Sequence, residues 1–165
     1  MLILLMSCGC ILTPEIESEP DEILYAPEIV VPVVPNDTAA ILELDIACTP
    51  VDFYFEVRDE NIRDTIYVRW LEDWSADDRE DNWPVFLIRP DGYVQRRSGG
   101  QTTLDISLYE VDSVHTLRVF VADRPPKTDD TNGMELPAGS EGQSDYHQWT
   151  FRIMPEGSGF CPPGI

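Results

Sequence analysis

The alternation of apolar and polar residues in short runs constrains the fold of this chain most. In such a run every second side chain is apolar, and the residues that share one face are Phe53, Phe55 and Val57 in the first run, Leu117, Val119 and Val121 in a later one, and Trp149, Phe151 and Ile153 in the last. A period of two places these side chains on one face of a β-strand. No stretch has the period of a long amphipathic helix, although residues 109–113 have room for a single turn. The pattern predicts an all-β fold.

The strands are expected where these runs lie between turn-forming residues. The expected strands are 39–47, 52–58, 66–72, 85–90, 92–97, 102–108, 115–123 and 146–154, with a turn at Pro90, Asp91 and Gly92. Strands that follow one another without crossover helices favour an antiparallel sandwich. We therefore expect an antiparallel β-sandwich of seven to eight strands within residues 38–165.

Residues 11–37 have a different composition, with five prolines, seven acidic residues and no period. Proline-rich, self-repelling sequence stays extended and semi-rigid. We interpret residues 8–37 as an acidic, Pro-rich linker. The alternative is that residues 28–35, EIVVPVVP, lie along the domain as an edge strand, where proline is tolerated.

The charge balance excludes some partners. The chain has 31 acidic and 11 basic residues and a net charge of −20. A nucleic-acid partner is excluded because its phosphates must be neutralised by clustered Lys and Arg. A basic patch for an anionic membrane surface is also missing. The acidic surface is typical of a solubilised protein, and the other interpretation is binding of a divalent cation or a cationic partner.

The first residues are apolar but form too short a stretch to span a membrane, which takes about 20 residues. The sequence Leu5-Met6-Ser7-Cys8 resembles the lipobox of bacterial lipoproteins. This resemblance implies that residues 1–7 are the remnant of a signal peptide and that Cys8 is acylated. It also implies a lipid-anchored protein of the cell envelope, at the outer membrane and facing the periplasm or the cell surface. No basic residue precedes the apolar stretch, and the alternative is a short strand with two buried cysteines.

Cys48 and Cys161 lie far apart in the sequence, which excludes a CxxC metal or redox motif. Two such cysteines near opposite ends of one domain predict a disulfide formed in an oxidising compartment.

Two segments carry a second resemblance. FYFEVRDENIRDTIYVRWLED (53–73) and HTLRVFVADRP (115–125) resemble the immunoglobulin-like domains of envelope proteins, of the PKD or cadherin-like sort. These domains have a tryptophan on their third strand, like Trp70, and a late strand that ends in Val-x-Asp, like Val121 to Asp123. The resemblance implies an immunoglobulin-like sandwich over about residues 40–155. The Cys48–Cys161 pair departs from the antibody pattern because it would join the ends of the domain and not its sheets.

An acidic turn is the candidate metal site. Calcium prefers several hard oxygen ligands, and the cadherin-like resemblance implies such carboxylates at strand ends. The candidate ligands are Asp59, Glu60, Asn61, Asp64 and Asp123. Arg63 lies inside the turn and no complete calcium motif is present, so the alternative is a solvated acidic hairpin.

The segment 70–84 places three tryptophans among acidic residues. We interpret Trp70 as a core residue. Trp74 and Trp83 flank a long loop, where aromatic rings can stack on sugars, anchor a protein partner, or close the loop over the edge of the sandwich. Residues 124–145 form a second long loop, which is typical of a disordered segment or a binding surface.

The sequence holds little that predicts catalysis. No GxSxG, HExxH, P-loop or GxGxxG motif occurs, and His115 and His147 are the only histidines. Serine, histidine and aspartate are present without the spacing of a triad motif. We therefore expect a binding or assembly module and not an enzyme, with no cofactor other than calcium. The alternatives are a calcium- or carbohydrate-binding module and, more weakly, a hydrolase.

Overall fold

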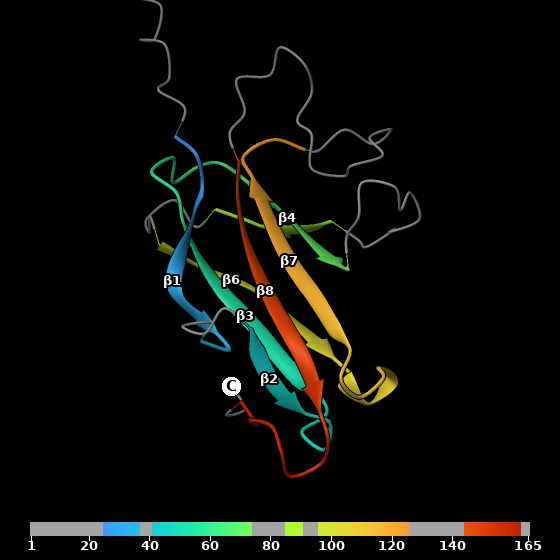
Figure 1. The fold of residues 1–165 in the computed structure, drawn as a ribbon. Coiled ribbons are helices and arrows are strands. Elements are labelled where there is room, and N and C mark those ends of the chain that lie inside the picture. The colour runs from blue at the N-terminus through green and yellow to red at the C-terminus, as the bar shows by residue number, and fades with distance from the viewer. Residues whose placement is uncertain (1–24, 37–40, 74–84, 91–95, 126–143, 163–165) are drawn as a thin grey trace, which may run out of the picture.

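A computed structural model describes residues 25–36, 41–73, 85–90, 96–125 and 144–162, which form two β-sheets packed face to face (Figure 1). The three-stranded sheet has the order β1-β3-β6, with β1 at Glu28–Val34, β3 at Val51–Arg58 and β6 at Arg96–Leu104. The five-stranded sheet has the order β2-β8-β7-β4-β5. Its strands are β2 at Leu42–Asp45, β8 at Ser144–Met154, β7 at Val114–Ala122, β4 at Ile66–Glu72 and β5 at Phe86–Ile88. One 3-10 turn, η1, spans Ile106–Leu108, and within the described ranges no helix is long and apolar enough to cross a membrane. The expected all-β fold is confirmed.

The core lies between the two sheets. Strands β3, β7 and β8 bury the faces that their alternation predicts, and Trp70 on β4 is buried as expected. The Trp149 ring stacks on Trp70 with centroids 5.9 Å apart and meets Phe53 of the other sheet edge-on at 5.4 Å. Phe55 meets Trp70 edge-on at 5.6 Å. These aromatic contacts join the sheets, since Phe53 and Phe55 come from β3 while both tryptophans come from the five-stranded sheet.

Residues 28–34 correct the expected linker boundary. This segment forms β1, which pairs antiparallel with β3 from Glu28 opposite Arg58 to Val34 opposite Tyr54. The strand lies at the edge of its sheet, where Pro32 does not have to donate to a second neighbour. The edge-strand interpretation is therefore correct, and the folded part of the chain begins before residue 38.

Strand β2 corrects the expectation of a purely antiparallel sandwich. It pairs in parallel with β8, with Leu42 opposite Phe151 and Asp45 opposite Met154. The chain then crosses to the other sheet and continues as β3, so β2 and β3 do not form a hairpin. The expected strand 39–47 is also shorter, because a turn follows Asp45.

Strand β6 joins two runs that we expected to be separate. It continues through Gly99 and Gly100, which resemble a turn in the sequence. At Gly99 a Cβ atom would lie 1.8 Å from the carbonyl oxygen of Phe55, so only glycine allows β6 this close to β3. The run from 102 ends as a strand at Leu104, and the helical turn in this part of the described chain is η1 and not residues 109–113.

The sandwich has two distinct ends. At the acidic end β1 begins, β3 and β7 finish, and the backbone N–H of Ile29 donates to Asp145 on β8 across 2.8 Å. At the opposite end, called here the disulfide end, Cys48 is joined to Cys161, which fits the expected pairing.

Asp45 ties the C-terminal turn to the disulfide end. Its carboxylate accepts hydrogen bonds from the backbone N–H groups of Ala47 at 2.9 Å, Gly157 at 2.6 Å and Gly159 at 3.4 Å. The hydrogen bond from Ala47, supported by those of the C-terminal turn, holds the pKa of the Asp45 carboxyl below its usual value although burial opposes this. Phe160 extends the pairing by donating its N–H to the carbonyl of Glu43.

Candidate functional site

The predicted calcium ligands lie at the acidic end. Asp59 and Asp123 directly follow β3 and β7 and are buried, whereas Glu60 is exposed and Asn61 and Asp64 are half-buried. One carboxylate oxygen of Asp59 accepts from the backbone N–H of Asn61 at 2.8 Å. Asp59 therefore folds its own turn, as aspartate commonly does after a strand.

These residues do not form a ligand cluster. Within the described ranges, no three His, Cys, Asp or Glu side chains are grouped so that they could hold a metal ion. Calcium binding at these five residues therefore stays a prediction of the sequence.

Other predicted site residues lie outside the described part of the chain. These are Cys8, the expected lipid attachment point, and Trp74 and Trp83, the expected binding surface. Most of the loop 124–145 is also outside it.

A hollow opens at the acidic end beside the start of β1. It is lined by Tyr25, Ala26, Glu28, Arg58 and Glu60, and Arg58 pairs with Glu28 in its wall. Its mixed and mostly charged lining is unlike the apolar lining of a ligand pocket.

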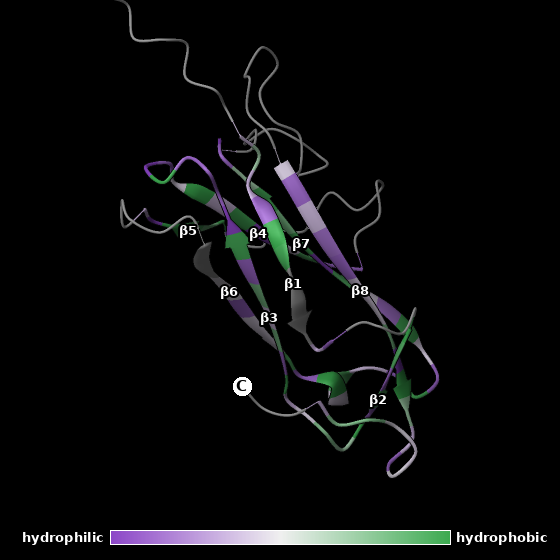
Figure 2. Cartoon of the chain, turned by 90° about the vertical axis from the view of Figure 1, so that its left-hand side faces the viewer, coloured by the Kyte–Doolittle hydropathy of each residue, from purple (hydrophilic) through white to green (hydrophobic). Residues whose placement is uncertain are grey.

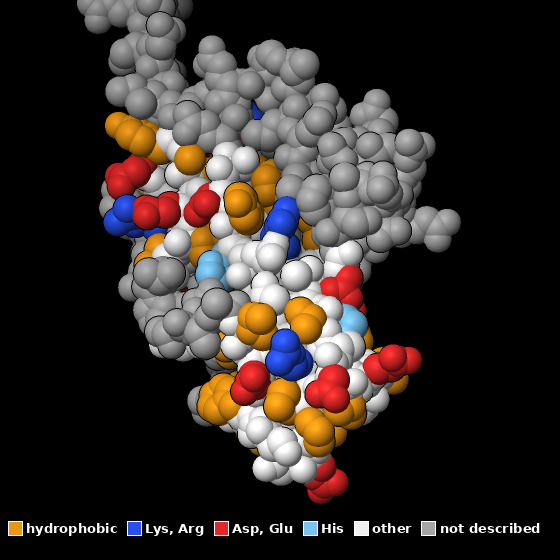
Figure 3. Space-filling model, viewed as in Figure 1, with side chains coloured by type: hydrophobic (Ala, Val, Ile, Leu, Met, Phe, Trp, Pro, Cys, Tyr) orange, Lys and Arg blue, Asp and Glu red, His pale blue; other side chains and the backbone are white. Residues whose placement is uncertain are grey.

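Several basic residues of this acidic chain lie on the outer face of the five-stranded sheet. We call it the arginine face. The side chains that point away from the core on β4, β5, β7 and β8 include Tyr67, Arg69, Leu87, Arg118, Phe120, Tyr146, Gln148 and Arg152. Figure 3 shows blue arginine atoms between orange apolar side chains on the molecule in this view. Arginine and aromatic residues are the types enriched in protein interfaces.

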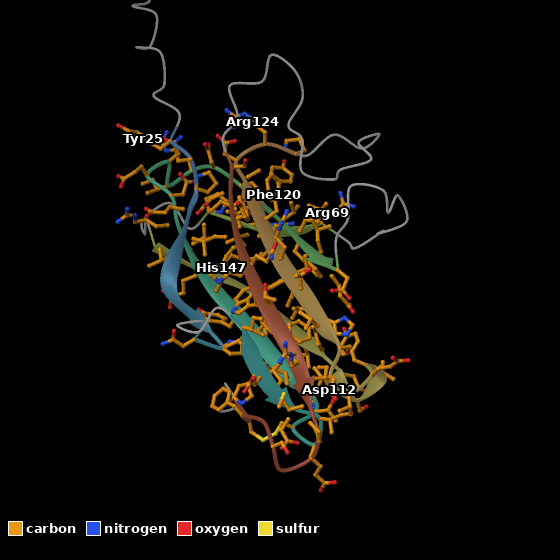
Figure 4. The ribbon with its side chains drawn as sticks, viewed as in Figure 1. Tyr25, Arg69, Asp112, Phe120, Arg124 and His147 are labelled. Carbon is orange, nitrogen blue, oxygen red and sulfur yellow. A yellow bond between two sulfur atoms is a disulfide. The ribbon has the colours of Figure 1, made fainter. Side chains whose placement is uncertain are left out.

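Contacts within the arginine face hold its side chains in place. Arg118 donates from Nε and Nη2 to the side-chain oxygen of Gln148, at 3.1 and 2.5 Å, and its guanidinium lies 5.1 Å from the centre of the Tyr146 ring. Arg69 and Phe120 are cross-strand partners, and Figure 4 labels them next to each other over β4 and β7. Phe120 is buried on this face, but Tyr146 is 59% exposed. Of these two aromatic rings on the arginine face, that of Tyr146 is therefore the more accessible.

The arginine face continues to the edge strand β5. Figure 2 shows β5 beyond β4, on the side away from β8. Val85, Phe86 and Leu87 are 40%, 50% and 52% exposed, while Ile88 packs on the core. Within the described residues β5 pairs only with β4. Exposed apolar side chains on an edge strand are typical of a docking site.

A hydrogen-bonded trio at the disulfide end was not among the sequence candidates. The Oγ of Ser113 lies 2.7 Å from Nε2 of His115, and Nδ1 of His115 lies 2.5 Å from Oδ2 of Asp73. Asp73 is 42 positions from His115 in the sequence. The alternation at residue 113 could have suggested that Ser113 and His115 share a face, but nothing in the sequence indicates Asp73 as the third member.

Comparison with models of known protein families and with curated proteins finds no match for this chain.

Proposed function

We propose that this chain is a lipid-anchored envelope protein with an immunoglobulin-like sandwich that binds a partner protein through the arginine face. The anchor rests on the lipobox resemblance at Cys8, the fold identity on strand order, and the binding role on the composition of one sheet face. Each part has its own test.

The strand order supports the immunoglobulin-like identity. In that fold the first, second and fifth lettered strands, A, B and E, lie in one sheet, while C, F and G lie in the other. Here β1, β3 and β6 take the positions of A, B and E, and β4, β7 and β8 take those of C, F and G. Trp70 is buried on β4, the strand that corresponds to C, where such domains carry a core tryptophan.

The arginine face is the observation that carries the binding role. Arg69, Arg118 and Arg152 gather on one face of a chain whose net charge is −20. Complementary charge then favours a partner with an acidic surface. Tyr146 and the apolar residues of β5 supply the kinds of side chain that dominate binding energy, and an edge strand can also pair with a strand of the partner.

Site-directed photo-crosslinking in the native cell tests the binding role. A photoreactive phenylalanine analogue at Tyr146 should give one discrete protein adduct. The matched control is the same analogue at Tyr54, a half-buried tyrosine on the outer face of the other sheet. A second substitution, Arg152→Glu, should reduce the adduct at position 146 because it reverses one charge of the face. Equal adducts at both positions, or no effect of Arg152→Glu, contradict the proposal.

Intact-mass analysis of the protein extracted from membranes tests the anchor. The expected mass corresponds to a chain that begins at Cys8 and carries acyl groups, and Cys8→Ser should release the protein from the membrane. Acyl chains contribute about 0.8 kcal/mol per buried methylene, so two or three of them hold a protein firmly. An unmodified chain in the membrane fraction would contradict the lipoprotein proposal.

The alternatives from the sequence have direct tests. A calcium-binding module should melt at a higher temperature in millimolar calcium, and Asp123→Asn should remove that shift. A carbohydrate-binding module should give glycan-array signals that are lost in Trp74→Ala or Trp83→Ala.

A further inference from the structure

We propose that Ser113 is a nucleophile activated by His115 and Asp73, and that it takes up acyl groups from small esters with apolar acyl chains. This goes beyond the binding role, because it assigns chemistry to the disulfide end. The inference rests on the connectivity of the trio, on how its members are held, and on the residues that surround the serine.

The connectivity is that of a serine-histidine-aspartate triad, which is recognised by geometry and not by sequence position. The serine oxygen faces Nε2, and the carboxylate faces Nδ1 of the same ring. A carboxylate that accepts from Nδ1–H leaves Nε2 as the base beside the hydroxyl. The trio therefore has its groups in the order that proton removal from Ser113 requires.

Asp73 is held firmly in the orientation that the trio needs. Its Oδ1 accepts from the backbone N–H of Thr116 at 2.7 Å, and its own N–H donates to the carbonyl of Thr116 at 2.8 Å. Since both main-chain contacts go to β7, Oδ2 is left pointing at His115 on the same strand. Pre-organisation of this kind is what keeps a catalytic histidine in one orientation.

The backbone is strained beside the trio. Within the described ranges, the non-glycine residues with positive φ are Asp73, at 42°, and Asp112, at 67°. One belongs to the trio and the other directly precedes Ser113. Figure 4 shows Asp112 at the end of the sandwich opposite Tyr25 and Arg124. Such conformations carry a cost and cluster at functional sites.

Aromatic rings enclose His115. Its ring lies 4.2 Å from that of Tyr109 and 5.8 Å from that of Phe151, and its side chain is 17% exposed. Tyr109 donates its hydroxyl to Glu72, and burial, together with this carboxylate, raises the pKa of Tyr109 well above its usual range. Tyr109 thus stays neutral, and the imidazole is fixed against an apolar surface.

Ser113 is half-buried, and its hydroxyl has a second acceptor, the carbonyl of Glu110 at 2.5 Å. The hydroxyl of Ser113 has one proton, and rotation about the Cβ–Oγ bond turns this proton from the carbonyl of Glu110 toward Nε2 of His115. Nearby in the sequence, Val111 is 43% exposed. Its side chain suits an apolar acyl chain, and the open position suits a small ester.

The reaction is balanced by ester and water alone. Ser113 Oγ attacks the ester carbonyl carbon while its proton moves to Nε2 of His115. The carbon–oxygen bond to the alcohol breaks, and Nε2 returns the proton to the leaving alcohol. Water then attacks the acyl-serine with His115 as base, which releases the carboxylic acid and restores Ser113.

Covalent labelling of the full chain tests this inference. The probes are an alkyl fluorophosphonate and p-nitrophenyl butyrate, and mass spectrometry locates the modified residue. Ser107 is the matched control within the same molecule, because it is exposed and its hydroxyl donates to the carboxylate of Asp105 at 2.6 Å and not to a histidine. We expect label on Ser113 and not on Ser107, and a loss of about 100-fold in labelling rate in His115→Gln, as for removal of a general base.

The comparison of two serines in one wild-type molecule does not depend on whether any variant folds. Melting curves of His115→Gln and Ser113→Ala show whether those variants keep the fold. Equal labelling of Ser113 and Ser107, or a labelling rate that His115→Gln leaves unchanged in a folded variant, would overturn the inference. Either result is separate from the crosslinking at Tyr146, so the binding role and the nucleophile can fail independently.

Discussion

Trp149 offers the sharpest test of what holds the two sheets together. Its side chain is fully buried, and its Nε1–H donates across 3.1 Å to the carbonyl of Pro35, just after β1. Trp149→Phe keeps an aromatic ring but removes this donor and about three heavy atoms. Phe151→Leu, two residues along the same buried face, also removes about three heavy atoms but breaks no hydrogen bond of this kind.

The magnitude follows from the two losses. Removal of about three buried carbon-sized groups costs about 2 kcal/mol in either variant. A buried carbonyl that loses its donor adds about 1–3 kcal/mol. The free energy of unfolding should therefore fall by about 4 kcal/mol in Trp149→Phe and by about 2 kcal/mol in Phe151→Leu. The difference between them measures the Trp149–Pro35 hydrogen bond.

Urea unfolding followed by far-ultraviolet circular dichroism is the suitable assay, because loss of a tryptophan changes the fluorescence signal itself. Hydrogen exchange provides a second readout, and amides of β1 should exchange faster in Trp149→Phe than in Phe151→Leu. If the two variants agree to within about 0.5 kcal/mol and β1 exchanges equally in both, the hydrogen bond does not hold β1 to the five-stranded sheet.

Further predictions concern the main chain and the disulfide end. Backbone N–H groups hold the pKa of the Asp45 carboxyl below its usual 3.8. The ionised carboxylate therefore stabilises the fold above about pH 4, and this stabilisation is lost as the pH falls through the lowered pKa of the folded state. The melting temperatures of Asp45→Asn and of the unchanged chain should differ at pH 7 and converge near pH 2. Gly99→Ala should unfold at lower urea than Gly100→Ala, because a Cβ at Gly99 would meet main-chain atoms at 1.8 Å while one at Gly100 meets a ring atom at 3.1 Å. Replacing Cys48 and Cys161 by serine should lower the free energy of unfolding by about 4–5 kcal/mol, as expected for a cross-link spanning 113 positions, and a loss below about 1 kcal/mol in urea unfolding would contradict the entropic account.

The core residues could be predicted from the sequence because the apolar alternation that marks them lies within each strand. The period of two in β3, β7 and β8 places each side chain on a face whatever the strand pairs with. Trp70, Trp149 and Phe151 are buried for this reason. Pairing partners are not local, so the parallel neighbour of β2, which lies more than one hundred residues away, had no signal in the sequence.

The predicted break between the runs 92–97 and 102–108 was wrong because of the two glycines between them. Gly99 and Gly100 are equally compatible with a turn and with a close approach between strands. Only the position of Phe55 on β3 decides between the two, and that position depends on the register of β3 and β6.

The trio at the disulfide end depends on register in the same way. Asp73 reaches His115 because β4 and β7 pair with Glu72 opposite Leu117, so the residue after β4 lies beside Thr116. A shift of one residue would turn Asp73 to the other face. The sequence therefore predicted the strands that carry the trio without indicating the trio itself.

The two ends of the sandwich separate the two proposed functions. With Cys8 as the anchor, the 20 positions from Cys8 to Glu28 can reach at most about 70 Å, and they join the domain at the acidic end, where β1 begins. Strand β7, Val114–Ala122, directly follows Ser113 and runs to that end, so the trio lies at the end of the domain opposite the tether while the arginine face lies along the side. Deleting about half of the linker should therefore change crosslinking at Tyr146, which depends on the reach of the tether to a neighbouring protein. It should leave fluorophosphonate labelling of Ser113 unchanged, since that reaction needs only the folded domain.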